Sequence, residues 1–156
     1  MTQEIRKIEI DTPRFIEQIR SILQQGEEKS VTFTVRGYSM RPFIEHNRDK
    51  VVLVPTRPPK TGEVVLAEIT PKIYVLHRII AIKGNTIILQ GDGNSAKEKE
   101  ITSADRIIGT AKAFIRKGRY ISTDSRVWRL YSTFWQIATF LRSTLLTMYR
   151  IKKHIL

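Results

Sequence analysis

The chain has 156 residues, of which 41% are hydrophobic and none is cysteine, and its formal net charge is +12. This length suits a single domain, and the hydrophobic fraction suffices for a packed core, which excludes wholesale disorder. The absence of cysteine excludes disulfides, thiolate metal sites and cysteine nucleophiles.

The positive charge is concentrated towards the C-terminus. Residues 1–111 carry 17 Lys and Arg against 14 Asp and Glu, whereas residues 112–156 carry 10 against 1. A general nucleic-acid-binding surface more often spreads over the fold or along one recognition helix. We therefore expect no specific nucleic-acid partner. A tail that bound nucleic acid through charge alone would lose affinity steeply with salt.

The N-terminal part predicts one short amphipathic helix. Residues 1–10 contain no apolar run, so we expect neither a secretory signal nor a membrane anchor there. Thr12 and Pro13 are typical of a helix start, and Gly26 of a helix end. Residues 13–25 span roughly 20 Å as a helix, which covers a core and does not cross a bilayer. Apolar residues one helical face apart form its stripe: Phe15, Ile16, Ile19, Ile22 and Leu23.

From Ser30 onward the pattern changes to short strands. Val31, Phe33 and Val35 alternate with polar residues, as in a half-buried strand. Short strands without helical patterns between them predict a mainly β protein with a coiled or partly closed antiparallel sheet. Turn sequences separate the further apolar runs, at residues 50–54, 63–69, 73–82, 86–90, 107–115 and 119–122.

The last part of the chain is apolar and basic at once. Aromatic and aliphatic residues dominate residues 128–149, interrupted by Arg129 and Arg142, and a basic run follows at residues 150–154. A helix over residues 130–149 is long enough to cross a bilayer, but its polar residues favour an interfacial or docking helix. The alternative is a helix that packs on the protein's own β-core.

These changes divide the chain into three parts. We predict an N-terminal amphipathic helix in residues 1–29, a β-domain in residues 30–122 and a basic amphipathic tail in residues 123–156. A basic tail rich in aromatic residues predicts binding to an anionic membrane surface. The expected location is therefore peripheral on a membrane through the C-terminus, and otherwise cytoplasmic.

A serine lies where the first strand ends, in the segment Gly37-Tyr-Ser39-Met-Arg-Pro42. A serine hydroxyl is a poor nucleophile until a base removes its proton, and Gly37 permits the tight turn that exposes it. Met40 suits packing rather than catalysis. By itself the segment is an ordinary structural turn, so only a nearby base gives Ser39 a catalytic meaning.

His77 is the best candidate for that base. It lies in the long apolar strand of residues 73–82, and its side chain suits proton transfer near neutral pH. The alternative is a hydrogen-bonded core histidine. Asp92, between two glycines, can orient an imidazole or merely bind the backbone of its turn, and Glu98 is within reach of the same loop.

Taken together, these segments resemble the type I signal peptidases, whose superfamily includes self-cleaving repressors of the DNA-damage response. The resemblance covers roughly residues 30–122, and the closing strands at residues 107–112 and 116–119 also fit it. Five segments occur in the family's order: Gly37-x-Ser39-Met40-x-Pro42, Asp49-Lys-Val-Val-Leu-Val54, Lys60-Thr-Gly-Glu-Val-Val65, Tyr74-Val-Leu-His77-Arg78-Ile-Ile80 and Gly91-Asp92-Gly-Asn94.

The pair His77-Arg78 resembles the serine–histidine branch of that family, found in the endoplasmic reticulum, archaea and sporulating bacteria, rather than the lysine-containing bacterial leader peptidases. The resemblance implies a serine endopeptidase that cleaves signal or leader peptides without a cofactor or metal. The implied substrate is an extended peptide or protein leader with small side chains before the cut. The alternative is a catalytically silent or self-processing regulatory protein with the same fold.

The resemblance also implies residue roles. Ser39 is the expected nucleophile, His77 the general base and then the general acid, and Asp92 the acidic partner. Glu98 stands where that branch often has a second aspartate. Backbone N–H groups near Ser39, with support from Gly37, are expected to bind the oxyanion. The chain departs from the family in having a short amphipathic helix in place of the N-terminal anchor.

Overall fold

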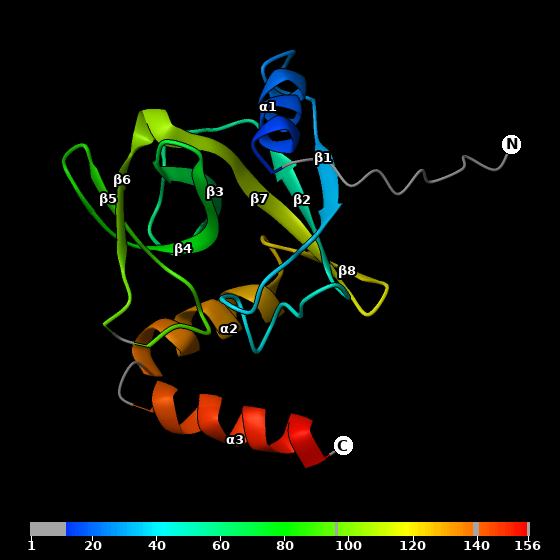
Figure 1. Ribbon diagram of the computed structural model, residues 1–156, viewed down its shortest axis with the longest axis vertical. Coiled ribbons are helices and arrows are strands. Elements are labelled where there is room, and N and C mark those ends of the chain that lie inside the picture. Colours follow the sequence, from blue (N-terminus) through cyan, green and yellow to red (C-terminus); the bar gives the residue numbers. More distant parts are fainter. Residues whose placement is uncertain (1–11, 96, 139–140, 156) are drawn as a thin grey trace, which may run out of the picture.

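The computed structural model describes residues 12–95, 97–138 and 141–155 (Figure 1). It confirms the mainly antiparallel β-fold with a helix before the sheet and helical elements after it. The strands are β1 (Val31–Thr34), β2 (Lys50–Val54), β3 (Val64–Thr70), β4 (Ile73–Lys83), β5 (Thr86–Gln90), β6 (Glu100–Ser103), β7 (Ile107–Arg116) and β8 (Arg119–Ser122). The helices are α1 (Thr12–Leu23), α2 (Arg126–Ile137) and α3 (Arg142–Ile155), with a short 3-10 turn at Ala104–Arg106.

Within the described residues the strands form one sheet in the order β1-β2-β7-β3-β4-β5-β6, and β8 pairs with β7. Every pairing is antiparallel, and register shifts interrupt several of them, which lets the sheet bend. Figure 1 shows α1 over the upper end of the curved sheet and α2 and α3 below it. The expected strands all match closely; β6 was not expected from the sequence.

The bent sheet encloses two groups of buried apolar side chains. The larger group lies under α1 and α2, and the smaller group lies between β3, β5 and the start of β7. Ile16, Ile19 and Leu23 of α1 are buried in the larger group, which confirms the predicted apolar stripe. Met40 is only 2% exposed and packs there too, so its predicted packing role is correct.

The tail forms two helices, not one helical segment. The α2 side chains of Trp128, Ser132 and Trp135 are buried against the body of the protein. The face of α2 that carries them thus packs on the protein's own core, as the alternative interpretation of the sequence predicted. In the parts of the chain that the structure describes, no helix has both the length and the apolar character that a membrane span requires.

Candidate active site

Ser39 lies in the connection between β1 and β2 and is half-buried. The turn before it requires glycine, because Gly37 has a φ of +100°, in the left-handed region. The Gly37 N–H donates to Nδ1 of His46 over 2.7 Å, and the Tyr38 ring lies 4.8 Å from the His46 ring. His46 thus fixes the turn that presents Ser39. The Gly37 N–H is not free to bind an oxyanion, so the supporting role of Gly37 is in the shape of the turn.

A second contact ties Ser39 to the loop after β5. The Gly93 N–H donates to the Ser39 carbonyl oxygen over 2.7 Å. At Gly91 a Cβ atom would overlap the Ser39 carbonyl oxygen and would lie 2.9 Å from Ser39 Cβ. Because Ser39 fills the place of a side chain at Gly91, only glycine fits at this position. No described residue forms a hydrogen bond with the Ser39 hydroxyl.

The strand register puts His77 on the same face of the sheet as Gly91. β4 and β5 pair with Arg78 opposite Gln90. One further step along this register brings Gly91 opposite His77. Directly opposite residues of an antiparallel pair point to the same face, with Cβ atoms about 5 Å apart. The missing side chain of Gly91 leaves a space on this face of the sheet, and Ser39 packs against it.

Glu100, at the start of β6, completes this group. Its Oε2 lies 2.9 Å from Nδ1 of His77, whose side chain is only 4% exposed. Both residues lie on one face of the sheet, since Leu89 is opposite both Glu100 and Ile79, and Ile79 is two residues from His77. An ionised carboxylate only accepts hydrogen bonds, so Nδ1 carries the proton and the lone pair is on Nε2.

Asp92 does not contact His77, in contrast to the predicted partnership. Its two oxygens accept from Arg78 Nε and Nη2 over 2.8 and 2.7 Å, and Tyr131 OH donates to Oδ2 over 3.1 Å. Arg78 and Asp92 are 0% and 1% exposed, respectively. The reason is strand alternation: Arg78 is adjacent to His77 in β4 and points to the opposite face. Asp92 follows Arg78 to that face.

α2 covers this buried ion pair. Ser132 Oγ accepts from Arg78 Nη1 over 2.7 Å, and Trp135 Nε1 donates to the Asp92 carbonyl oxygen over 2.9 Å. Arg78 also lies 5.0 Å from the ring centroid of Trp128. These contacts satisfy a charge pair that would otherwise be costly to bury. They hold the loop that contacts Ser39.

Glu98 belongs to its own turn. Its Oε2 accepts from the Ser95 N–H over 3.1 Å, and its side chain is exposed. The acidic residue that reaches the imidazole is thus Glu100, two positions further along the chain. The sequence contained little indication of this role, because the preceding residues 91–99 carry two acidic and two basic side chains and the strand of Glu100 has only four residues. Nothing in the sequence indicated the role of His46.

A buried carboxylate connects α3 to the serine loop. Glu45 accepts from Arg41 over 2.7 Å, from Tyr149 OH over 2.8 Å and from Lys153 over 2.6 Å. Burial by itself raises the pKa of Glu45, but the hydrogen bonds from Arg41, Lys153 and Tyr149 outweigh it and lower the pKa to about 2. Arg41 lies 4.1 Å from the Tyr38 ring. Both tail helices are therefore linked to the turn that carries Ser39.

The parts of the chain that the structure describes bring together no group of three metal-binding side chains. The residues suited to catalysis are instead Ser39, which packs against Gly91, and His77, which is bonded to Glu100. Such a set suits the removal of a proton from a hydroxyl followed by nucleophilic attack.

Comparison with known proteins agrees with this chemistry. The model of the family described as Peptidase S24-like matches residues 4–112, more than half of the chain. No match was found among curated proteins. The match spans the turn of Ser39, the strand of His77 and the strand of Glu100. It confirms the superfamily that the sequence resembled, that of the signal peptidases and the self-cleaving repressors, without specifying the branch. The chain belongs to the peptidase S24-like family of serine peptidases.

Proposed function

We propose that this protein is a serine endopeptidase in which Ser39 is the nucleophile, His77 the general base and Glu100 the residue that orients His77. One observation carries the proposal: His77, in the strand paired with the one that leads to Gly91, is bonded to a carboxylate, and Ser39 packs into the place of a Gly91 side chain. The arrangement follows the logic of serine hydrolases, in which nucleophile, base and orienting acid are recognised by geometry.

The proposed reaction proceeds in two stages. His77 Nε2 takes the proton of the Ser39 hydroxyl while Oγ attacks the scissile carbonyl carbon, and Glu100 stabilises the imidazolium. The proton then passes to the leaving amine as the C–N bond breaks, and an acyl-serine remains. Water, deprotonated by His77, attacks that ester and releases the acid and the free serine. The Ser39 N–H is our proposed oxyanion donor, since the Gly37 N–H already donates to His46.

An apolar groove lies on the face of β4 that carries Tyr74 and Leu76, opposite to the face of His77. It lies between α1, β1 and the β3–β4 pair. Val35 and Leu76 line it and adjoin the segments that carry Ser39 and His77. β1 is an edge strand, so one side of its backbone is available to pair with a peptide strand. The apolar part of the lining consists of Phe15, Ile16, Phe33, Val35, Leu66, Tyr74 and Leu76.

The substrate we propose is a signal or leader peptide with small side chains before the cut. This rests on the His77-Arg78 pair, which resembles the serine–histidine branch of the signal peptidases, and on the edge strand β1, which leads to the turn of Ser39. The decisive experiment incubates wild type, Ser39→Ala and His77→Ala with a leader-peptide library and identifies the products by mass spectrometry. Cleavage by wild type alone supports the proposal; equal cleavage by all three proteins overturns it.

Self-processing is the second candidate, because the superfamily that the match indicates includes self-cleaving repressors. Intact mass of the purified protein distinguishes the two functions. A trimmed wild-type chain beside an intact Ser39→Ala chain identifies self-cleavage. An intact wild-type chain that cuts added peptides identifies a peptidase acting on other molecules.

A further inference from the structure

We propose that the outward faces of α2 and α3 dock on an anionic membrane surface. On α2, large apolar side chains recur every three or four residues on the side away from the core. Val127 is 67% exposed, Leu130 72%, Phe134 56% and Ile137 75%. The opposite side of the same helix is buried, so packing on the core does not explain the apolar character of the exposed Val127, Leu130 and Phe134.

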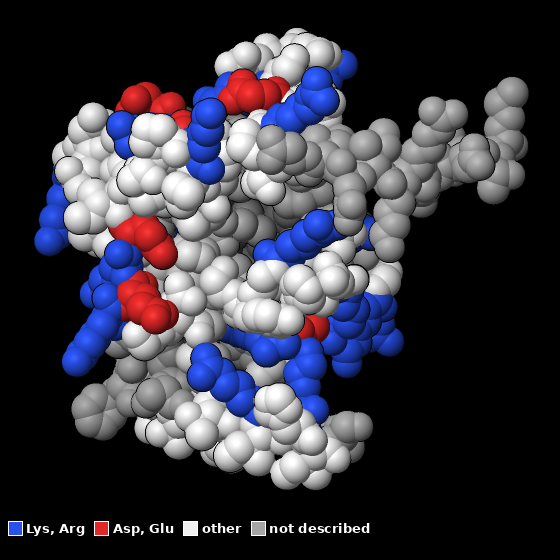
Figure 2. Space-filling view, in the orientation of Figure 1, with Lys and Arg blue, Asp and Glu red and all other residues white. Residues whose placement is uncertain are grey.

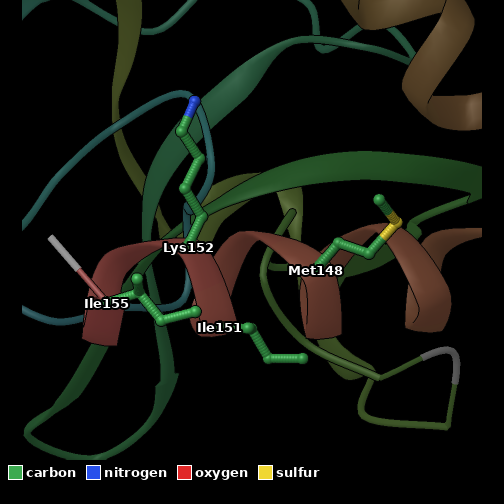
Figure 3. A pocket seen from close by; sticks show the side chains of 4 residues that line it. All are labelled: Met148, Ile151, Lys152 and Ile155. Carbon is green, nitrogen blue, oxygen red and sulfur yellow. The ribbon is translucent and has the colours of Figure 1, made fainter.

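α3 continues the pattern. Met148 is 62% exposed, Ile151 53% and Ile155 77%, while Leu146 on another side of the helix is 6% exposed. Figure 3 shows Ile151 and Ile155 on one side of α3 and Met148 further along the helix, whereas the long side chain of Lys152 extends from the helix in another direction; all four line a shallow pocket. An apolar strip with a lysine at its border is the arrangement of helices that lie in a membrane interface.

The two stripes share one spacing. With the exposed Leu141 between the helices, the outward positions follow steps of three and four residues, and Thr144 is the single polar member. The complete set is Val127, Leu130, Phe134, Ile137, Leu141, Thr144, Met148, Ile151 and Ile155. We call it the outer apolar stripe. Within each of the two helices this spacing gives one apolar side that is kept out of the core, which is unnecessary for packing and useful for docking.

The positive charge of the tail indicates which kind of partner binds the stripe. After Asp124 the sequence contains six Lys and Arg and no acidic residue. Figure 2 shows Lys and Arg side chains above the lower edge of the molecule, where α3 lies, and mostly uncharged side chains at the edge itself. Arg126 and Lys152 are exposed and lie next to the stripe on their helices, and Arg150 is exposed on another side of α3. In a dimer of two copies these cations would face one another without acidic partners, which opposes association. An anionic lipid surface accepts both the apolar side chains and the cations.

The stripe is separate from the catalytic residues. α2 and α3 use their inner sides to hold Asp92 and Glu45, and the stripe uses their outer sides. Docking on lipid therefore leaves the inner contacts in place. It also means that lipid binding does not depend on the proposed peptidase activity, so the two proposals fail or succeed independently.

The test is co-sedimentation of the full chain with phosphatidylglycerol–phosphatidylcholine vesicles and with pure phosphatidylcholine vesicles. We expect binding to the anionic vesicles, weakened by salt, and little binding to the neutral ones. Leu130→Gln/Phe134→Gln and Met148→Gln/Ile151→Gln should each lower the partition coefficient about 10-fold. The matched control is Ile73→Gln/Tyr120→Gln, which removes two side chains that are 57% and 59% exposed elsewhere. It should bind like wild type, as should Ser39→Ala.

Urea unfolding of each variant establishes that the stripe substitutions leave the fold intact, as expected for exposed positions. Three results overturn the proposal. One is the lack of binding to either vesicle by folded wild type. Another is binding that the stripe variants do not weaken. The third is a wild-type dimer in solution that the stripe variants dissociate, which would make a second copy the occupant.

Discussion

His77 Nδ1 and Glu100 Oε2 lie 2.9 Å apart, across the sheet from β4 to β6. Gly91 follows β5, the strand between them, and its missing side chain leaves the room that Ser39 occupies. A carboxylate at Nδ1 fixes the orientation of the imidazole and stabilises its protonated form. The acid that supports the proposed base thus comes from a strand at the edge of the sheet, not from the glycine-flanked loop.

Glu100→Gln should lower kcat while leaving KM and the free energy of unfolding nearly unchanged. The amide cannot stabilise an imidazolium, so we expect a loss of about 10- to 1000-fold in kcat. Steady-state kinetics on a cleaved leader peptide, together with urea unfolding, measure both effects. Glu98→Gln is the matched control and should retain wild-type kcat. The reverse ranking of the two variants would return the orienting role to Glu98.

Asp92→Ala should destabilise the protein strongly. Removing this carboxylate leaves Arg78 as a fully buried charge without its counter-ion, at a cost of about 3–5 kcal/mol in the free energy of unfolding. Urea or thermal unfolding measures it. Glu98→Ala, which removes an exposed carboxylate nearby, should change stability by only about 0.5 kcal/mol. An Asp92→Ala protein of native stability but without activity would contradict a structural role for this carboxylate.

Gly91→Ala should displace Ser39. The added methyl group would overlap the Ser39 carbonyl oxygen, which is backbone and cannot rotate away. We expect a loss of peptidase activity of about 100-fold or more, because small displacements of reacting groups are costly. Gly26→Ala is the control, since its Cβ would meet only the flexible end of the Glu28 side chain. Equal activity of the two variants would show that Ser39 does not depend on Gly91.

Acid should weaken the attachment of α3 through Glu45. The pKa of Glu45 falls from 4.5 to about 2 on folding, so its stabilising effect is complete above pH 4.5 and is lost as the pH falls towards 2. We expect about 1–2 kcal/mol, because solvent around the 47% exposed Lys153 screens part of the attraction. Urea unfolding across this range checks the effect.

Glu45→Gln provides the comparison for that measurement. The amide does not titrate, so the difference in stability between wild type and Glu45→Gln should shrink as the pH approaches 2. A difference that stays constant with pH would mean that Glu45 contributes through packing alone. Tyr149→Phe should reduce the effect by less than Glu45→Gln, because it removes one hydrogen bond and keeps the charge pairs.

Much of the fold was predictable from local patterns. Alternation located β1, and continuous apolar runs located β2 to β5, β7 and β8 within a few residues. β6 escaped because its four residues, Glu100–Ser103, are mostly polar and too few to show a period. It forms a strand because its backbone pairs with the edge of β5. The tail was predicted as one helical segment, and the structure separates it into α2 and α3.

The sequence by itself determined the strand pattern, the apolar stripe of α1, the concentration of charge in the tail and the candidates Ser39 and His77. These depend on the order of residues along the chain, which local periodicity and turn chemistry report directly. Tertiary structure alone decided which acid meets His77 and which side of each tail helix stays exposed. Both depend on cross-strand register and on packing between distant segments. For this reason Asp92 binds Arg78, and Glu100 binds His77.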